Sequence, residues 1–269
     1  MFLEDVKNRR SVRTFDGKGL SAEVLDDLKE YAKNIVNPYN IPVEFAFLNA
    51  KEHDLSSPVL AGEKEYITAK VKKGANADVA YGYSFEDLLM YAVSKNLGTV
   101  WIGGTMPREK FEKASNLAED EIMPCISPIG YAADKMGVKE VLMRKGVKAD
   151  SRFDFGELFF KDSFDTTLTE SEAKDLGILT ALEAVRLAPS AVNKQPWRVV
   201  VNETGTHFYE KKDRGYDNGT YDLQKVDLGI AIHHFEKECA ESGKAVKFAI
   251  ADPGLTLPEK TEYIASYLF

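Results

Sequence analysis

The chain has 269 residues, 44% of them hydrophobic, which is enough for one large domain or two small ones. Its formal net charge of −8 argues against nucleic acid as the main partner, because phosphate-backbone binding needs a basic surface. Two cysteines, Cys125 and Cys239, are too few for a disulfide framework or a cysteine-rich metal site. Since the start has no signal-peptide pattern and no run of apolar residues is of membrane-spanning length, we expect a cytoplasmic protein without a membrane span.

The first half alternates helical and extended patterns. Apolar residues at helical spacing predict a helix over 20–36, with Ser21 as its N-cap, and a proline-containing break follows. Residues 43–48 alternate as a strand does. Residues 84–98 predict an apolar helix with Gly98 as its C-cap. Residues 99–104 read as a short extended element that ends in glycines, and 121–132 as a strand with edge prolines.

The second half repeats part of this order. We expect one helix over 169–188, a proline-rich break, and strands over 197–201 and 207–212. A second apolar helix over 227–242 follows, with Gly243 as its C-cap, and then a strand over 245–253.

The order helix, polar break, strand, apolar helix, glycine and strand therefore occurs twice, about 150 residues apart. A change from apolar to polar residues near 155–170 predicts two halves, 1–160 and 161–269. Each half carries a feature that the other lacks. The first half has a basic segment near its start, and the second has the longer polar break.

The basic segment NRRSVRTF is the first candidate binding element. It holds Arg9, Arg10, Ser11 and Arg13. Guanidinium groups bind phosphate through bidentate hydrogen bonds, and a serine hydroxyl adds a donor. The alternative is a solvated charged face, and these residues alone do not decide between the two.

The polar break PSAVNKQPW, residues 189–197, is the second candidate. Its asparagine and glutamine amides could pair with the edge of a planar heterocycle, and its prolines restrict the loop. The alternative is a helix-to-strand turn with local side-chain bonding, which the loop's residues alone favour.

A third candidate is the pair Gly103 and Gly104, where a ligand could approach the backbone closely. Neither a Walker motif nor a dinucleotide-binding glycine motif is present. His233 and His234 are adjacent in a predicted helix and point in different directions, so we expect no metal site there. The sequence offers no convincing catalytic triad, and we assign no catalytic acid or base.

Taken together, these segments resemble the FMN-dependent nitroreductase family. The resemblance covers nearly the whole chain and rests on four motifs: R-R-S-x-R-x-F at Arg9 to Phe15, L-G-T-x-W-I-G-G at Leu97 to Gly104, P-I-G-Y at Pro128 to Tyr131, and P-S-x-x-N-x-Q-P-W at Pro189 to Trp197. The arginine of DSRFDFGEL, Arg152, is similar to a basic residue near the end of the family's domain.

The resemblance implies an α+β fold of the nitroreductase type, with a central, mostly antiparallel sheet between helical layers. It implies an enzyme that passes electrons from NAD(P)H through bound FMN to a small acceptor such as a nitroaromatic or a quinone. The implied phosphate and ribityl contacts are Arg9, Arg10, Ser11, Arg13 and Arg152, with Arg13 alternatively near the pyrimidine ring. The implied flavin-ring or ribityl contacts are Ile102, Gly103, Gly104, Pro189, Ser190, Ala191, Asn193 and Gln195.

Ordinary family members carry the arginine and amide motifs in one domain, form homodimers and bind flavin at the dimer interface. Here the two motifs lie in different halves. The chain is therefore similar to two-repeat members in which one chain imitates the dimer. We expect a monomer with an internal pseudo-two-fold, packed through the helices near 84–98 and 227–242, with one FMN. The alternatives are a flavin-binding sensor or carrier without turnover and a homologue that binds nothing.

Overall fold

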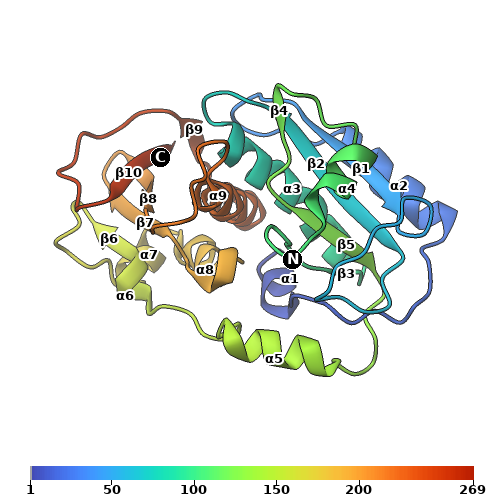
Figure 1. Ribbon diagram of the computed structural model, residues 1–269. Helices are drawn as coiled ribbons and strands as arrows, with labels where there is room; N and C mark the ends of the chain where they lie inside the picture. Colours follow the sequence, from blue (N-terminus) through green and yellow to red (C-terminus); the bar gives the residue numbers. More distant parts are fainter. Residues whose placement is uncertain (1) are drawn as a thin grey trace. The chain divides into compact units, whose positions relative to one another are not determined.

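The computed structural model describes residues 2–269, which form two compact units (Figure 1). We name residues 8–150 the N-terminal unit, and residues 2–7 together with 151–269 the C-terminal unit. The border follows residue 150, whereas the sequence pattern places it after residue 160. The first helix, α1 (Phe2–Asn8), ends where the N-terminal unit begins.

The N-terminal unit holds one mostly antiparallel sheet with strand order β1-β2-β5-β3, and β4 pairs with β2. Its strands are β1 (Val43–Asn49), β2 (Glu65–Lys72), β3 (Gly98–Thr99), β4 (Glu121–Ile122) and β5 (Ile126–Gly130). Its helices are α2 (Ala22–Lys33), α3 (Ala77–Ser94), α4 (Arg108–Ala114) and α5 (Val138–Gly146).

The two faces of this sheet have separate cores. On one face, α3 packs on β1 and β2, and Phe85 of α3 contacts Phe45 of β1. On the other, Tyr66 of β2 meets Phe111 of α4 edge to face, with ring centroids 4.9 Å apart. Strand alternation makes this possible, because successive side chains of β2 point to opposite faces. The sheet therefore lies between helices, as expected.

The C-terminal unit holds a second sheet of order β6-β7-β8-β10-β9, in which only the β6–β7 pair is parallel. Its strands are β6 (Phe159–Lys161), β7 (Trp197–Asn202), β8 (Gly205–Lys211), β9 (Lys247–Ala249) and β10 (Thr261–Leu268). Its helices are α6 (Phe155–Leu158), α7 (Glu170–Asp175), α8 (Leu179–Leu187), the 3-10 turn η1 (Ala191–Asn193) and α9 (Leu223–Ser242).

Helix α9 is the central helix of this unit. It contacts β7, β8, α8 and η1, and Phe235 packs against Phe208 of β8. Gly243 ends α9 in the left-handed conformation (φ 74°), which confirms the predicted C-cap. The α+β class and the mostly antiparallel pairing are confirmed, and each unit has its own sheet.

Two local predictions were wrong. Gly98 is not the C-cap of α3, which ends at Ser94 with Lys95 as its cap, and Gly98 instead opens β3. The predicted single helix over 169–188 is divided into α7 and α8, because Gly177 between them is left-handed (φ 70°).

Three predicted strands are shorter than expected. Only β4 and β5 form within 121–132, only β9 within 245–253, and only Gly98–Thr99 is strand near 99–104. Within residues 2–269, no helix combines the length and apolar character that a membrane crossing requires.

Candidate functional site

The arginine segment of the N-terminal unit is held extended by backbone pairing on both sides. Ser11 forms an isolated parallel bridge with Thr99, and Val12 N–H donates to the Thr99 carbonyl at 2.9 Å. Phe15 N–H donates to the Ala61 carbonyl at 2.8 Å. The side chain of Val12 lies over Gly98, where an added Cβ would come within 2.8 Å of it. Gly98 is therefore needed for this close approach.

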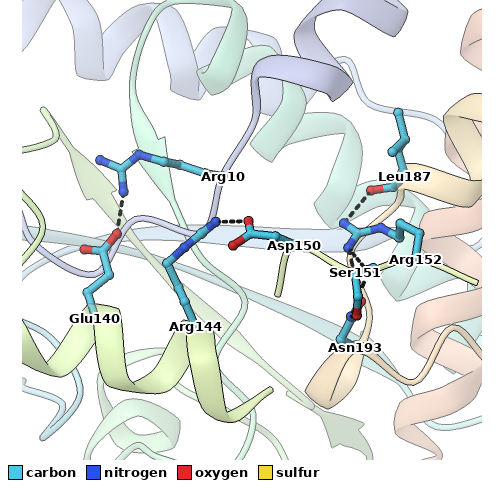
Figure 2. A network of polar contacts seen from close by, with 8 residues as sticks. All are labelled: Arg10, Glu140, Arg144, Asp150, Ser151, Arg152, Leu187 and Asn193. Atoms are coloured by element: carbon cyan, nitrogen blue, oxygen red, sulfur yellow. Dashed lines mark hydrogen bonds and ion pairs between the residues drawn. The ribbon is translucent and has the colours of Figure 1, made fainter. Parts of the chain in front are cut away.

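Helix α5 supplies an acidic anchor for the segment. Glu140 is buried and accepts a hydrogen bond from Arg10 Nη1 (Figure 2). It accepts another from Arg13 N–H at 3.1 Å. A buried carboxylate that binds one guanidinium and one backbone donor is well compensated. Arg10 is therefore paired within the protein.

Arg9, Arg13 and Arg144 of α5 make up a second, electropositive group, which we call the arginine cluster. Burial lowers the pKa of Arg9, Glu86 opposes this effect, and repulsion from Arg144 lowers the pKa further. Burial also lowers the pKa of Arg13; Glu140 opposes this, and Arg144 and Arg9 add to the lowering. The three guanidiniums are therefore close enough to repel one another.

The cluster has unused hydrogen-bond donors. Arg9 Nε and the Nε and Nη1 atoms of Arg13 are buried and have no hydrogen-bond partner among residues 2–269. Arg144 forms an ion pair with Asp150, shown in Figure 2. Buried donors without partners are costly, and repelling cations add to that cost. An anion such as a phosphate would satisfy both the donors and the charge.

The glycines after β3 lie in a loop that Arg108 holds. Arg108 donates to the carbonyls of Gly103 (2.9 Å), Met123 (2.7 Å) and Pro124 (3.0 Å). An added Cβ at Gly104 would meet nothing within 4 Å, so the backbone there is open. Ile102 is buried and pairs with Ile126 in both directions at 2.9 Å, which makes it a core residue.

In the C-terminal unit, the loop 189–195 forms a tight turn between α8 and β7. Asn193 N–H donates to the Ser190 carbonyl at 3.0 Å, and the Ser190 hydroxyl accepts from Gln195 N–H at 2.8 Å. Gln195 is buried; its Oε1 accepts from Phe153 N–H at 3.0 Å, and its Nε2 donates to the Asn193 carbonyl at 3.3 Å. The Gln195 amide therefore shapes the loop itself.

Arg152 belongs to this same loop. It donates to Asn193 Oδ1 at 3.3 Å, to the Leu187 carbonyl at 3.1 Å and to the Ser151 carbonyl at 2.7 Å (Figure 2). Asn193 Nδ2 in turn donates to the Ser151 carbonyl at 3.0 Å. In this structure Arg152 braces the loop that carries Asn193.

The candidate residues thus form two groups, one in each unit. The N-terminal group holds Arg9, Arg10, Ser11, Arg13, Ile102, Gly103 and Gly104. The C-terminal group holds Arg152, Pro189, Ser190, Ala191, Asn193 and Gln195. Sequence reasoning missed Glu140 and Arg144. Their spacing of four residues in a predictable helix puts both on one face, but nothing local shows that this face meets Arg9, Arg10 and Arg13.

The two mostly antiparallel sheets with their helices define the class of this protein as an α+β protein with the nitroreductase-like fold. The chain belongs to the family whose model is described as "Putative TM nitroreductase", which matches residues 2–239. This membership places the protein among the oxidoreductases.

Among solved structures, the chain is similar to the "putative nitroreductase" of Thermotoga maritima, at 21% identity and a TM-score of 0.64, with 99% of this chain and 92% of that chain covered. It also matches an FMN-dependent nitroreductase of Clostridium difficile (18% identity, TM-score 0.43, 52% of this chain, 94% of that chain). A NADH dehydrogenase/NAD(P)H nitroreductase of Bacteroides thetaiotaomicron, "putative" in its description, matches at 23% identity (TM-score 0.42, 50% of this chain, 88% of that chain). None of the curated proteins compared with the chain matches it.

Proposed function

We propose that the protein is an FMN-dependent oxidoreductase of the nitroreductase type, with NAD(P)H as electron donor and a small molecule such as a nitroaromatic or quinone as acceptor. The observation that supports it most directly is the arginine cluster, whose buried donors on Arg9 and Arg13 lack partners within residues 2–269. FMN carries a phosphate that fits these donors. When bound, FMN supplies the redox chemistry, accepting a hydride and passing electrons to the acceptor.

The chain's own residues bind and orient this cofactor. Arg9, Arg13 and Arg144 hold the phosphate, while Glu140 fixes Arg10 and the backbone of Arg13 beside them. Open backbone at Gly104 and the loop 189–195 contact other parts of the flavin. From the division of the family's motifs between the two halves, we further propose that both groups serve one FMN per chain and that each half corresponds to one protomer of the family's dimer.

The test is spectroscopic. Purified protein supplied with FMN and freed of excess should show the two visible absorption bands of an oxidised flavin. NADH or NADPH should then bleach these bands in the absence of oxygen, and a nitroaromatic or a quinone should restore them. A protein that keeps no flavin contradicts the cofactor assignment. One that keeps flavin but is not bleached by either nucleotide contradicts the enzymatic role.

A further inference from the structure

The loop 189–195 holds an unfavourable backbone conformation. Val192, Asn193 and Gln195 have positive φ values of 48°, 59° and 50°. The left-handed region is costly for residues with a Cβ, and most costly for a β-branched residue such as valine. Three such residues within four positions require contacts from outside the turn to hold them.

One of these contacts comes from α9. The carboxylate of Asp227 accepts the N–H of Ala191, with both of its oxygens 3.0 Å from the nitrogen. Ala191 is the first residue of η1, directly before Val192, so this hydrogen bond fixes the entry to the left-handed residues. Asp227 is 4% exposed, so water competes little for the same N–H group.

The surroundings of Asp227 disfavour the ionised form of its carboxylate. Burial raises the pKa of this group, the Ala191 N–H opposes the rise, and Asp222 and Glu210 add to it by repulsion. Tyr216 also lies within electrostatic range of the carboxylate. An apolar side chain would fill a buried position in α9 without this cost. The hydrogen bond to Ala191 is thus the feature that a hydrophobic residue could not replace.

We propose that Asp227 is a positioning residue that holds the loop 189–195 in its flavin-binding conformation, an inference that rests on the proposed function of this loop. The role needs an oxygen that accepts the Ala191 N–H and does not need a negative charge. An asparagine at 227 can present its Oδ1 in the same place, whereas alanine or leucine cannot.

The chain offers a matched control in the same helix. Glu238 of α9 is 7% exposed, and its carboxylate accepts the N–H of Leu3 at 3.0 Å, far along α9 from the loop. Glu238→Ala removes the same kind of interaction as Asp227→Ala, a buried carboxylate on a backbone donor. Asp227→Leu keeps more volume and replaces Asp227→Ala if the alanine variant does not fold.

The first readout is amide hydrogen exchange of residues 189–195 in ligand-free protein. Asp227→Ala should speed exchange of the Ala191 amide by about tenfold or more, the cost of leaving a backbone donor without its acceptor. Asp227→Asn should stay within about threefold of the wild type, and Glu238→Ala should leave this segment unchanged.

The second readout is FMN affinity by flavin fluorescence. Asp227→Ala should weaken binding by about tenfold to a hundredfold, and Asp227→Asn should restore it to within about threefold. Unchanged exchange and affinity in Asp227→Ala, or an equal loss in Glu238→Ala, would overturn the inference. If the wild type binds no FMN, the proposed function fails, and the exchange result still decides whether Asp227 holds the loop.

Discussion

Arg9 and Arg10 are adjacent in sequence, but their guanidinium groups differ in their hydrogen-bond partners. Arg10 is paired with Glu140, whereas Arg9 has a buried Nε without a hydrogen-bond partner among the described residues and lies within range of Arg144. The motif alone cannot separate the two, because the partner of Arg10 lies on α5, remote in sequence. If the cluster binds phosphate, Arg9 has donors available for it.

This difference gives the first prediction. Arg9→Ala should weaken FMN binding by about 1.5–3 kcal/mol, the range for hydrogen bonds to charged groups. Riboflavin, which lacks the phosphate, should bind the variant and the wild type equally, and Arg214→Ala, at an exposed position, should change neither affinity. Fluorescence titration with both flavins measures this. An equal loss of riboflavin affinity would place Arg9 elsewhere on the ligand or in folding.

A second prediction concerns Glu210 of β8, which is fully buried and has no hydrogen bond to either carboxylate oxygen among residues 2–269. Burial, with repulsion from Asp222, raises its pKa to about 8, although Lys212 and Lys225 oppose the rise. The unfolded chain releases this proton near pH 4.5, so between pH 4.5 and 8 the native state binds more protons than the unfolded state.

The free energy of unfolding should therefore fall through that interval as the pH rises, by up to about 1.4 kcal/mol per pH unit from this group. Glu210→Gln, which does not titrate, should remove this contribution. Thermal melts from pH 5 to 9 compare the two proteins. The melting temperature of the variant should increase relative to that of the wild type as the pH rises. A constant difference between the two would show that Glu210 is ionised throughout.

At the scale of elements, the sequence predicts best where a local signal marks the start or the end of a helix. Ser21 caps α2 through Val24 N–H, and Gly243 ends α9, both as expected. The prediction failed at Gly98, because Asn96 takes the left-handed conformation after α3 and the glycine is needed under Val12. Strand β10, which pairs with both β8 and β9, was missed. These features depend on long-range contacts that periodicity does not encode.

The same contrast between local and long-range effects gives a third prediction, on two glycines near the arginine segment. Gly17 (φ 80°) and Gly62 (φ 82°) are both left-handed, but an added Cβ at Gly17 meets nothing within 4 Å, whereas at Gly62 it would collide with the Phe15 carbonyl oxygen. Gly17→Ala should cost about 1–2 kcal/mol of unfolding free energy. Gly62→Ala should cost about 2–4 kcal/mol.

Because Ala61 pairs with Arg13 and Phe15, Gly62→Ala should also displace the arginine segment and weaken FMN binding, while Gly17→Ala should not. Denaturant unfolding and fluorescence titration on both variants measure the two effects. If the two variants are equally stable, the backbone near Phe15 shifts at no cost in free energy. If they bind FMN equally well, the contact between Gly62 and Phe15 does not influence the cofactor site.

At the scale of the whole molecule, each unit carries one of the two groups of candidate residues that we propose to serve one flavin. The arginine cluster lies in the N-terminal unit and the amide loop in the C-terminal unit. A symmetric arrangement with two flavins would need a second arginine segment and a second amide loop, and the sequence shows neither of these. We therefore expect one FMN per chain. Flavin released by heat and measured against protein should approach one equivalent, and two equivalents would reveal a second site.

The last prediction concerns assembly. A flavin site whose parts come from two subunits loses flavin on dilution, because the subunits separate. If one chain supplies both parts, as we propose, Arg9 and Asn193 are covalently linked, so the effective concentration of one part near the other does not fall on dilution. We therefore expect a monomer of 30.0 kDa that retains FMN across a dilution series. Size-exclusion chromatography with light scattering, combined with flavin retention, provides the measurement. A stable species of twice that mass that sheds flavin as it dissociates would mean that Asn193 serves a flavin held by another chain.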